Sequence, residues 1–324
     1  MSHVPLALVD ILNFLIPAVI FALLALGLNV QWGYTGLFNG GVAAFFGLGA
    51  YATAILMTPY SPPNPFYPGH LGGFSQSFPV AAVGAMFVAG LAGLLIAIPI
   101  LRLRADYFAI ATLALAEIVR LVLTNAESLT GGSIGIPLIP RPLPVRTDYN
   151  FSTLLLGVLV VAILIMVLVA LDVLSGAPWG RVLRGIREDE EATLALGKNV
   201  HSFRLQAFVI GCALMGLAGA VFASYRGFVS PAQFDPLATF TIYVMVILGG
   251  SGNNKGVVLG AFLYYAFDWV SVRLDDRLPD DLALRMPYIR LMVIGVVLVG
   301  LVIYRPEGIL RERKRKFPPV RAPP

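Results

Sequence analysis

The chain has 324 residues, of which 58% are hydrophobic and only 13% charged, and its mean hydropathy is +0.82. A soluble protein carries about 25% charged residues, which keep its surface in contact with water. This composition therefore indicates a surface that largely faces lipid, and it excludes the two soluble domains that the length alone would allow.

The net charge of +5 is concentrated beyond the last apolar segment, in residues 305–324. That position is typical of a basic cytoplasmic tail, so no nucleic-acid partner is predicted. The single cysteine, Cys212, excludes an intramolecular disulfide. The three histidines are scattered along the chain, and zinc needs several converging ligands, so no metal site is predicted. We expect no cleavable signal peptide, because the first residues lack a basic region and a small-residue cleavage site.

Nine apolar segments follow one another along the chain. A membrane-spanning helix needs about 20 mostly apolar residues, because each residue rises about 1.5 Å across a hydrocarbon layer of roughly 30 Å. Two shorter segments flank a polar, glycine-rich run at residues 249–256. We therefore predict an all-α, polytopic transmembrane bundle over residues 1–304, with eight to ten segments that include short or broken helices. The segments are Val9–Val30, Gly36–Met57, Pro79–Leu101, Tyr107–Thr124, Phe151–Leu174, Phe203–Tyr225, Leu237–Leu248, Val257–Val272 and Tyr288–Tyr304.

The placement of lysine and arginine predicts the orientation, because cytoplasmic loops are enriched in these residues. The run Arg311–Lys316, the connection Ser175–Ser202 and the pair Arg102/Arg104 are separated by even numbers of segments. All three are therefore predicted to be cytoplasmic. The side of the N-terminus stays open, since nine full crossings would place it outside and a re-entrant segment Gly36–Met57 would place it inside.

Two segments combine a glycine-rich break with a helix of small residues. The first break contains Gly36, Gly40 and Gly41, and the second is the run 249–256 followed by Gly260. Such pairs occur in transporters built from an internal repeat, where broken helices lie near the membrane midplane. Close helix packing through G-x-x-x-G faces produces the same pattern, so both interpretations are kept.

Two glycine-rich stretches resemble nucleotide-binding motifs but fail on context. The stretch Gly47–Ala52 has dinucleotide-binding spacing, yet it lies inside an apolar helix with no strand before it. In the run 249–256, the spacing is wrong for a phosphate-binding loop, and Lys255 is followed by Gly256 instead of Ser or Thr. We therefore predict no cofactor bound by this chain; ATP, if it is used, is bound by other subunits.

The connection Ser175–Ser202 is the most informative polar stretch. Its apolar residues recur at helical spacing in two groups, which predicts two short helical pieces. A short amphipathic helix held between two long ones could transmit a push from a docked partner. The simpler interpretation is a solvated loop whose basic residues fix the topology. The apolar positions are Val182, Leu183 and Ile186 in the first piece and Ala192, Leu194, Ala195 and Leu196 in the second.

Within this connection, Glu191-Ala-Thr-Leu-Ala-Leu-Gly197 resembles the Glu-Ala-Ala-x-x-x-Gly loop of ABC importer permeases, which docks on the ATPase subunits. It departs from that pattern at Thr193 and lacks the Ile-x-Leu-Pro ending. Nearly the whole chain is similar to the LivM-type permeases of branched-chain amino acid ABC importers. The stretches that carry this resemblance are Gly33–Gly36, Ala44–Tyr51, Tyr107–Ala114, Glu117–Arg120, Gly180–Asp189, Leu217–Ala220 and Ile247–Gly252.

The resemblance implies a permease subunit for branched-chain or other neutral amino acids that is not itself an enzyme. Its implied partners are a second, LivH-like permease, two ATP-binding subunits that hold ATP and Mg, an external solute-binding protein, and the lipid of a bacterial inner membrane. Closure of the ATPase pair on ATP would rock the permeases between inward-open and outward-open forms. The residues expected to couple to the ATPases are Arg184, Arg187, Glu191, Ala192 and Gly197.

Polar residues within the apolar segments are the other candidates for function. Glu117 and Arg120 lie one turn apart in an apolar helix, which predicts an ion pair, either with each other or with a partner permease. Asp268 lies near the end of its segment, and we expect it to reach the outer interface. Around the first glycine break, freed backbone groups could meet a zwitterionic solute, although helix capping is the simpler role. The candidate pathway-lining residues are Asn29, Thr35, Asn39, Gly40, Gly41 and Phe45.

Other functions are kept as alternatives. Urea or a short amide is the main rival solute, because permeases of this family carry it and a pathway with few fixed charges suits any net-neutral solute. A self-contained secondary transporter or channel would favour several intramembrane carboxylates for ion coupling, and only Glu117 and Asp268 are candidates. A membrane-embedded enzyme has no acid–base or metal constellation to support it.

Overall fold

The computed structural model describes residues 6–64, 66–142, 149–275, 285–305 and 307–312. Within these ranges the chain is helical, and only isolated β-bridges occur outside the helices. The predicted all-α, polytopic bundle is therefore confirmed. The helices are α1 Leu6–Leu28, α2 Val42–Met57, α3 Phe78–Ile100, α4 Ala105–Asn125, α5 Glu127–Thr130, α6 Tyr149–Gly176, α7 Pro178–Glu188, α8 Glu190–Ala195, α9 Val200–Arg226, α10 Leu237–Gly249, α11 Asn254–Asp275 and α13 Met286–Tyr304.

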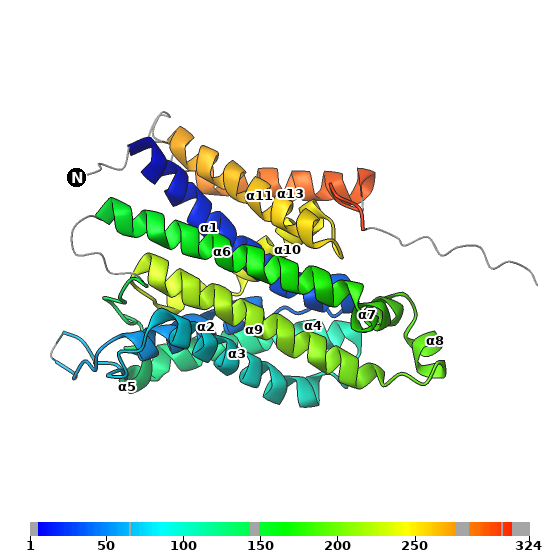
Figure 1. Ribbon diagram of the computed structural model, residues 1–324, viewed down its shortest axis with the longest axis horizontal. Helices are drawn as coiled ribbons and strands as arrows, with labels where there is room; N and C mark the ends of the chain where they lie inside the picture. The colour runs from blue at the N-terminus through cyan, green and yellow to red at the C-terminus, as the bar shows by residue number, and fades with distance from the viewer. Residues whose placement is uncertain (1–5, 65, 143–148, 276–284, 306, 313–324) are drawn as a thin grey trace, which may run out of the picture.

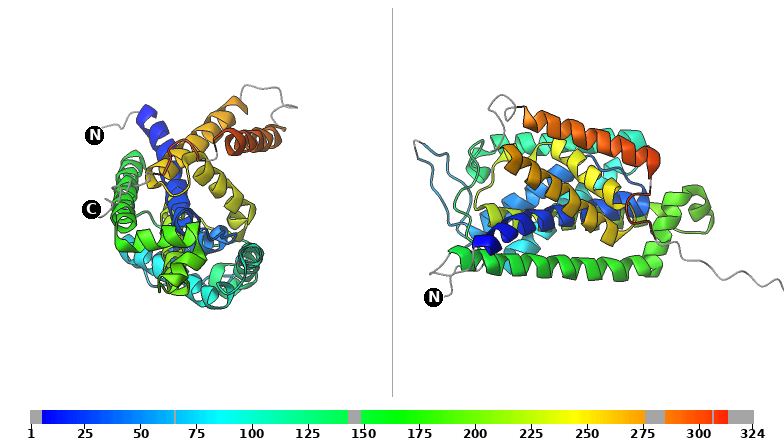
Figure 2. Two further views of the ribbon diagram at one scale, coloured as in Figure 1. Left: turned by 90° about the vertical axis from the view of Figure 1, so that its right-hand side faces the viewer. Right: turned by 90° about the horizontal axis from the view of Figure 1, so that it is seen from above.

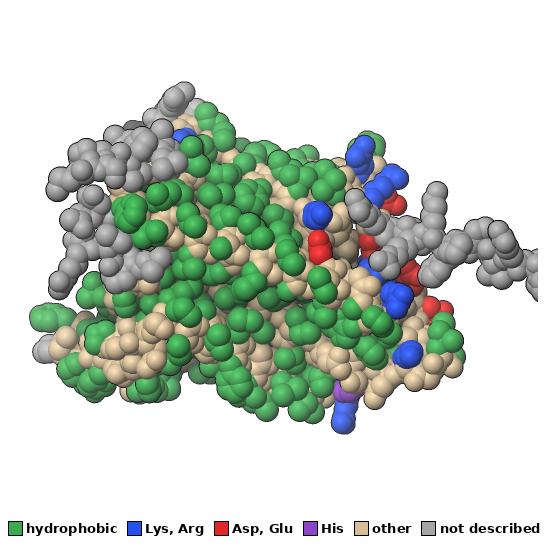
Figure 3. Space-filling view, in the orientation of Figure 1, with side chains coloured by type: hydrophobic (Ala, Val, Ile, Leu, Met, Phe, Trp, Pro, Cys, Tyr) green, Lys and Arg blue, Asp and Glu red, His purple; other side chains and the backbone are tan. Residues whose placement is uncertain are grey.

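The long helices run side by side along the long axis of the molecule (Figure 1). The short helices α7 and α8 project from one end, which we call the α7 end, and α5 lies at the opposite end, the α5 end (Figures 1 and 2). Hydrophobic side chains cover the long sides in the view of Figure 3, whereas the charged side chains gather at the α7 end. This distribution is the one expected for a bundle surrounded by lipid.

Six helices are long and apolar enough to cross a membrane, namely α1, α3, α4, α6, α9 and α11. Three shorter apolar helices, α2, α10 and α13, accompany them. Each of the nine predicted segments therefore corresponds to one helix. The predicted start of the second segment at Gly36 is wrong, because helix α2 begins only at Val42.

Helix α1 does not lead directly into α2. Its last turn widens into a π-helical turn, Asn29–Gly33, and residues 36–41 are then non-helical. The π-turn lies at the α7 end, since the carbonyl of Gly33 accepts a hydrogen bond from Arg187 of α7. Helix α1 therefore begins at the α5 end, where Asp10 pairs with Arg273 at the end of α11 (3.6 Å). Within the described residues, α1 and α13 thus start on the side opposite to α7, and the nine apolar helices alternate in direction between the two ends.

The order of packing is repeated with the direction reversed. Helix α1 is followed by a non-helical stretch and the short α2, then by α3 and α4; helix α9 is followed in the same way by residues 227–236, the short α10, then α11 and α13. Helix α3 packs antiparallel on α9, and α11 packs antiparallel on α1. Each unit therefore packs against the long first helix of the other. This repeat differs from the one suggested by the glycine runs, which pairs the break before α2 with the turn between α10 and α11.

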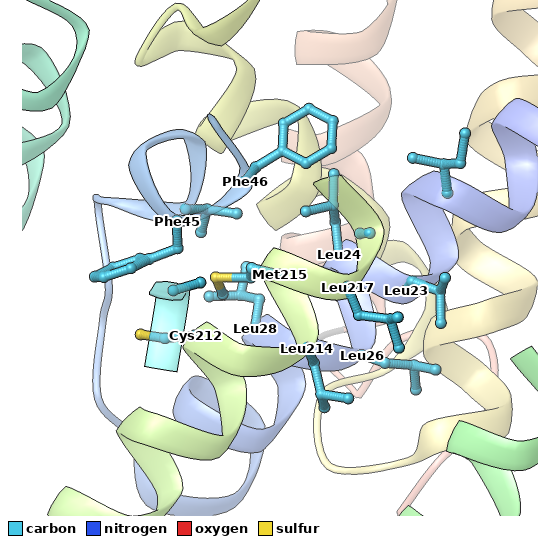
Figure 4. Close-up of a cluster of buried hydrophobic side chains, with 14 of the residues drawn as sticks. Leu23, Leu24, Leu26, Leu28, Phe45, Phe46, Cys212, Leu214, Met215 and Leu217 are labelled. Carbon is cyan, nitrogen blue, oxygen red and sulfur yellow. The ribbon is translucent and has the colours of Figure 1, made fainter. Parts of the chain in front are cut away.

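The core is formed where α9 crosses α1, α2 and α3. Leucines of α1 and α9 interdigitate there with Phe45, Phe46 and Met215 (Figure 4). Small residues let the backbones approach closely: a Cβ on Gly49 of α2 would lie 2.3 Å from the carbonyl oxygen of Gly216 of α9. Gly256 and Gly260 likewise bring α11 against α10. Packing through small residues, one of the two interpretations of the glycine pattern, thus accounts for these positions.

Candidate functional site

Helices α7 and α8 form the predicted connection, and α7 is anchored on the bundle. Leu183 and Ile186 are buried, and Gly180 is packed so closely that a Cβ there would lie 2.4 Å from the carbonyl oxygen of Ser175. Arg184 also donates a hydrogen bond to that carbonyl (3.0 Å). The apolar face of α7 is therefore used for packing against the bundle, as its helical spacing predicts.

Helix α8 presents its apolar side chains to solvent. Its first turn is capped by Asp189, whose Oδ1 accepts from the amide of Ala192 (3.0 Å), and Glu190 pairs with Arg204 of α9 (2.7 Å). Leu194 and Leu196 are 52% and 78% exposed, although their spacing predicts an apolar face in contact with the bundle or membrane. The helix is held in place by its polar contacts, so its leucines remain free to contact another protein.

The other predicted coupling residues fall into two groups. Glu191, Ala192 and Gly197 are exposed on or just after α8, and Gly197 adopts a left-handed conformation (φ +74°) with open space around it. Arg184 and Arg187 point instead toward the bundle. Only the first group lies on the surface that a partner could reach.

Arg187 ties α7 to two other segments at this end. One guanidinium nitrogen donates to the carbonyl of Gly33 in the π-turn, and another contacts the carboxylate of Glu312 (2.6 Å). Both side chains of the ion pair are largely shielded, with 24% and 20% exposure. A movement of α7 would therefore pull directly on the end of α1 and on the chain after α13.

Residues 307–312, which we call the C-terminal strap, continue this connection. The amides of Ile309 and Leu310 donate to the carbonyls of Leu248 and Gly249 at the end of α10 (3.0 and 3.1 Å). Asn253, in the turn between α10 and α11, donates to the carbonyl of Leu310 (3.3 Å). The strap thus links α7 to the α10–α11 turn. The rest of the predicted basic tail, residues 313–324, lies outside the described residues.

A buried cluster of amides lies directly behind the strap. The Asn29 side chain donates to Oδ1 of Asn254 (3.1 Å) and accepts from the amide of Gly252 (2.8 Å). Tyr34 donates to the same Asn254 oxygen (2.5 Å), and the Asn254 amide donates to Asp172 of α6 (2.9 Å). This cluster joins α1, α6 and α11. It borders a polar cavity of about 790 Å³ that also touches Arg184 and Glu312.

The predicted pathway residues around the first break are buried, and most of them are already engaged. Asn39 donates to Gln31 (2.8 Å) and accepts from the amide of Gly41 (2.8 Å), while the amide of Gly40 donates to Thr112 of α4 (2.9 Å). Thr35 donates to the carbonyl of Gln31. Phe45 is fully buried against Phe208 of α9. In this conformation the group stabilises the break before α2.

Glu117 and Asp268, the two acidic residues singled out within apolar segments, are both paired, although Glu117 and Arg120 are 42% and 32% exposed on the surface of α4. Arg120 donates through Nε to Glu117 (2.9 Å), so the two residues contact each other within α4. Asp268, which was expected to reach the outer interface, pairs with Arg290 of α13 (3.1 Å). The Arg290 side chain is only 15% exposed, which means that α13 is held to α11 by a shielded ion pair.

Several of these residues were not singled out from the sequence. Gln31, Asp172, Asn254 and Arg290 all lie in or beside apolar segments, where a polar side chain is costly without a partner. That energetic cost was the signal in the sequence that these residues need partners. Their partners are up to 225 residues away in the chain, as for Asn29 and Asn254, so the pairing itself required the fold.

Comparisons with known proteins agree with this architecture. Residues 10–302 match the family model described as the permease component of the branched-chain amino acid transport system. The chain is 33% identical to the high-affinity branched-chain amino acid transport system permease protein LivM of Escherichia coli, over 90% of this chain and 68% of that protein. It is 29% identical to the probable branched-chain amino acid transport permease protein LivM of Methanocaldococcus jannaschii, over 93% of both.

A more distant relative is the autoinducer 2 import system permease protein LsrC of Escherichia coli, which is 27% identical over 79% of this chain and 73% of that protein. No solved structure matches the chain. The family match covers all nine apolar helices of the described bundle. The chain therefore belongs to the family of permease components of branched-chain amino acid ABC transport systems.

Proposed function

We propose that this chain is a transmembrane subunit of an ATP-driven importer for branched-chain or other neutral amino acids. The names of the two LivM relatives support this substrate class. A second, LivH-like permease would complete the pathway, two ATP-binding subunits would hold ATP and Mg, and an external solute-binding protein would deliver the solute. The chain itself binds no nucleotide in this proposal.

The observation that carries the proposal is the exposed apolar surface of α8. Leu194 and Leu196 stand beside the exposed Glu191 and Gly197 at the end of the molecule where α7 and α8 project (Figure 1). Two neighbouring exposed leucines offer apolar surface that a docked partner would remove from water. We infer that an ATPase subunit docks here, and that the α7 end faces the cytoplasm of a bacterial cell.

The contacts of α7 provide a route for the coupling. When the docked ATPase moves, α7 moves with α8, and Arg187 transfers the displacement to the π-turn of α1 and to Glu312 of the strap. The strap is bonded to the end of α10. Helix α1 leads into the non-helical stretch before α2, and α10 follows residues 227–236. The push would therefore reach the helices next to both of these stretches together.

The test compares Leu196→Glu with Leu138→Glu. The second leucine is 88% exposed, in the loop between α5 and α6, and it provides a matched substitution away from the proposed docking surface. Loss of about 1.4 kcal/mol of interface energy weakens binding tenfold, and a central apolar contact is worth at least that much. We expect Leu196→Glu to lower ATPase recovery in a pull-down about tenfold, with unchanged bundle stability. Equal recovery for the two variants would overturn the docking surface.

A self-contained secondary transporter is the contrasting function. Such a protein would move leucine or urea in liposomes without ATP and without partner subunits. Measuring ATP-dependent uptake of leucine and of urea by the complete complex distinguishes the two candidate solutes. Uptake of urea without uptake of leucine would identify the short amide as the substrate.

A further inference from the structure

A half-enclosed cavity of about 420 Å³ lies where the two interrupted helices begin. Val42 and Ala43 of α2 and Ala238 and Thr239 of α10 all line it, and the rest of its wall comes from α1, α9, α11, further residues of α2 and α10, and Gln233 of the short helical turn Pro231–Phe234. Cavities of roughly 300–1,000 Å³ are typical of sites for small molecules. This cavity is therefore large enough for one amino acid and lies at the centre of the repeat.

Its lining combines an apolar wall with one charge of each sign. Ile20, Leu24 and Phe46 provide aliphatic and aromatic surface, and Figure 4 shows Leu24 and Phe46 in the cluster formed by α1, α2 and α9. Arg226, the last residue of α9, contributes the positive charge, and Asp268 of α11 contributes the negative charge. A neutral amide such as urea carries no charged group to pair with these two residues, whereas an amino acid zwitterion carries a carboxylate for the positive charge and an ammonium group for the negative one.

The starts of α2 and α10 add positive potential to the same space. The helix dipole places partial positive charge at each start, while the first amides already have acceptors, such as the carbonyl of Asp235 for the amide of Ala238 (2.9 Å). The hydroxyl of Thr239 accepts from the amide of Ala43 (3.3 Å), so the two helix starts are in direct contact beside the cavity. Together with Arg226, they favour the binding of a carboxylate in the cavity.

The negative charge of Asp268 is fixed in position by a neighbouring residue. Oδ1 of Asp268 contacts Arg290 of α13 at 3.1 Å, and the Asp268 side chain remains 33% exposed. Arg290 is not part of the cavity wall, so it holds the carboxylate from behind. Asp268 is thus positioned to receive an ammonium group from within the cavity.

We propose that this cavity binds the zwitterion of an aliphatic amino acid, with its carboxylate toward Arg226 and the starts of α2 and α10, its ammonium group toward Asp268, and its side chain against Ile20, Leu24 and Phe46. The proposal rests on the importer function proposed above and specifies where in this chain the solute is held. Binding between two interrupted helices would also connect solute occupancy with the helices that the strap and the π-turn adjoin.

The first test fills the cavity. The complete complex is reconstituted with its binding protein, and ATP-dependent uptake of L-leucine is measured for Ala238→Phe and for Ala162→Phe, an equivalent change on the exposed surface of α6. Ala238→Phe should reduce uptake at least tenfold while assembly and ATPase recovery stay normal, and Ala162→Phe should leave uptake unchanged. Equal uptake by both variants would overturn the site. If the wild-type complex itself takes up no leucine, the proposed function fails, which is a different result.

The second test separates ligand binding from the Asp268–Arg290 ion pair. Asp268→Asn should raise the KM for leucine at least tenfold. The double variant Asp268→Asn/Arg290→Gln removes both charges, so it restores a neutral contact between α11 and α13. If Asp268 serves the solute, the double variant keeps the raised KM. Recovery of the wild-type KM in the double variant would assign Asp268 a purely structural role and contradict the proposal.

Discussion

The close crossing of α2 and α9 provides a stringent test of the packing. In Gly49→Ala, the new Cβ would lie 2.3 Å from the carbonyl oxygen and 2.4 Å from the Cα of Gly216. Atoms in ordinary contact are about 3.5–4.0 Å apart, so the two helices must separate by about 1 Å. Both neighbouring atoms belong to the backbone, which means that no rotamer change can relieve the clash.

The expected cost follows from these distances. Overpacking a core costs typically about 1–3 kcal/mol, and we expect the upper part of that range because the backbone must move. Alanine is favoured over glycine within a helix by about 1 kcal/mol, which offsets part of the cost. The net loss of stability for Gly49→Ala is therefore about 2 kcal/mol.

Gly300→Ala in α13 is the matched control. A Cβ at Gly300 meets no atom within 4 Å, so only the helix-propensity gain applies. Thermal unfolding of the two purified variants in one detergent would measure the difference. One kcal/mol shifts Tm by about 2–4 °C in a domain of 150–250 residues, so Gly49→Ala should melt about 4–8 °C below the wild type. If Gly49→Ala and Gly300→Ala melt together, the close crossing is wrong.

Two further predictions concern the α7 end. Glu312→Gln removes the charged partner of the shielded Arg187 guanidinium, so we expect the free energy of unfolding to fall by about 1–3 kcal/mol. A thermal double-mutant cycle with Arg187→Gln measures the coupling between the two residues. Additive losses of stability would show that this ion pair does not hold the strap to α7. Asn254→Leu leaves the buried amide of Asn29 and the buried hydroxyl of Tyr34 without their shared acceptor, so it should lower stability by about 2 kcal/mol. The control for the second variant is Ser271→Ala, because the Ser271 hydroxyl bonds the carbonyl of Phe267 within its own helix (2.6 Å); equal melting of Asn254→Leu and Ser271→Ala would contradict the cluster.

The apolar helices could be predicted from the sequence because their signal is local. Length and hydropathy define a span, and α3, α6 and α9 begin and end within a few residues of the predicted segments. Helix α2 was extended too far, since the residues from Gly36 to Gly41 carry no charge that would mark the end of an apolar segment. What interrupts the helix there is a set of contacts with other segments, such as the bond from the amide of Gly40 to Thr112.

The arrangement of the polar residues could not be predicted in the same way. Asn29 was selected as a pathway residue because it stands beside a glycine break, yet its partners are Asn254 and Gly252 at the other end of the sequence. Leu194 and Leu196 have the spacing of a packed face and are exposed in this single chain. Helical spacing indicates that a face will be covered, but it does not tell whether the cover belongs to the same chain.

ATP dependence in a reconstituted membrane tests the central claim most directly. The chain is purified with the proteins that accompany it, placed in liposomes, and supplied with labelled L-leucine and the solute-binding protein, with or without ATP on the ATPase side. We predict that two ATP-binding subunits and a second permease co-purify and that leucine accumulates only with ATP. Leucine movement by this chain alone, without ATP or partners, would contradict the account.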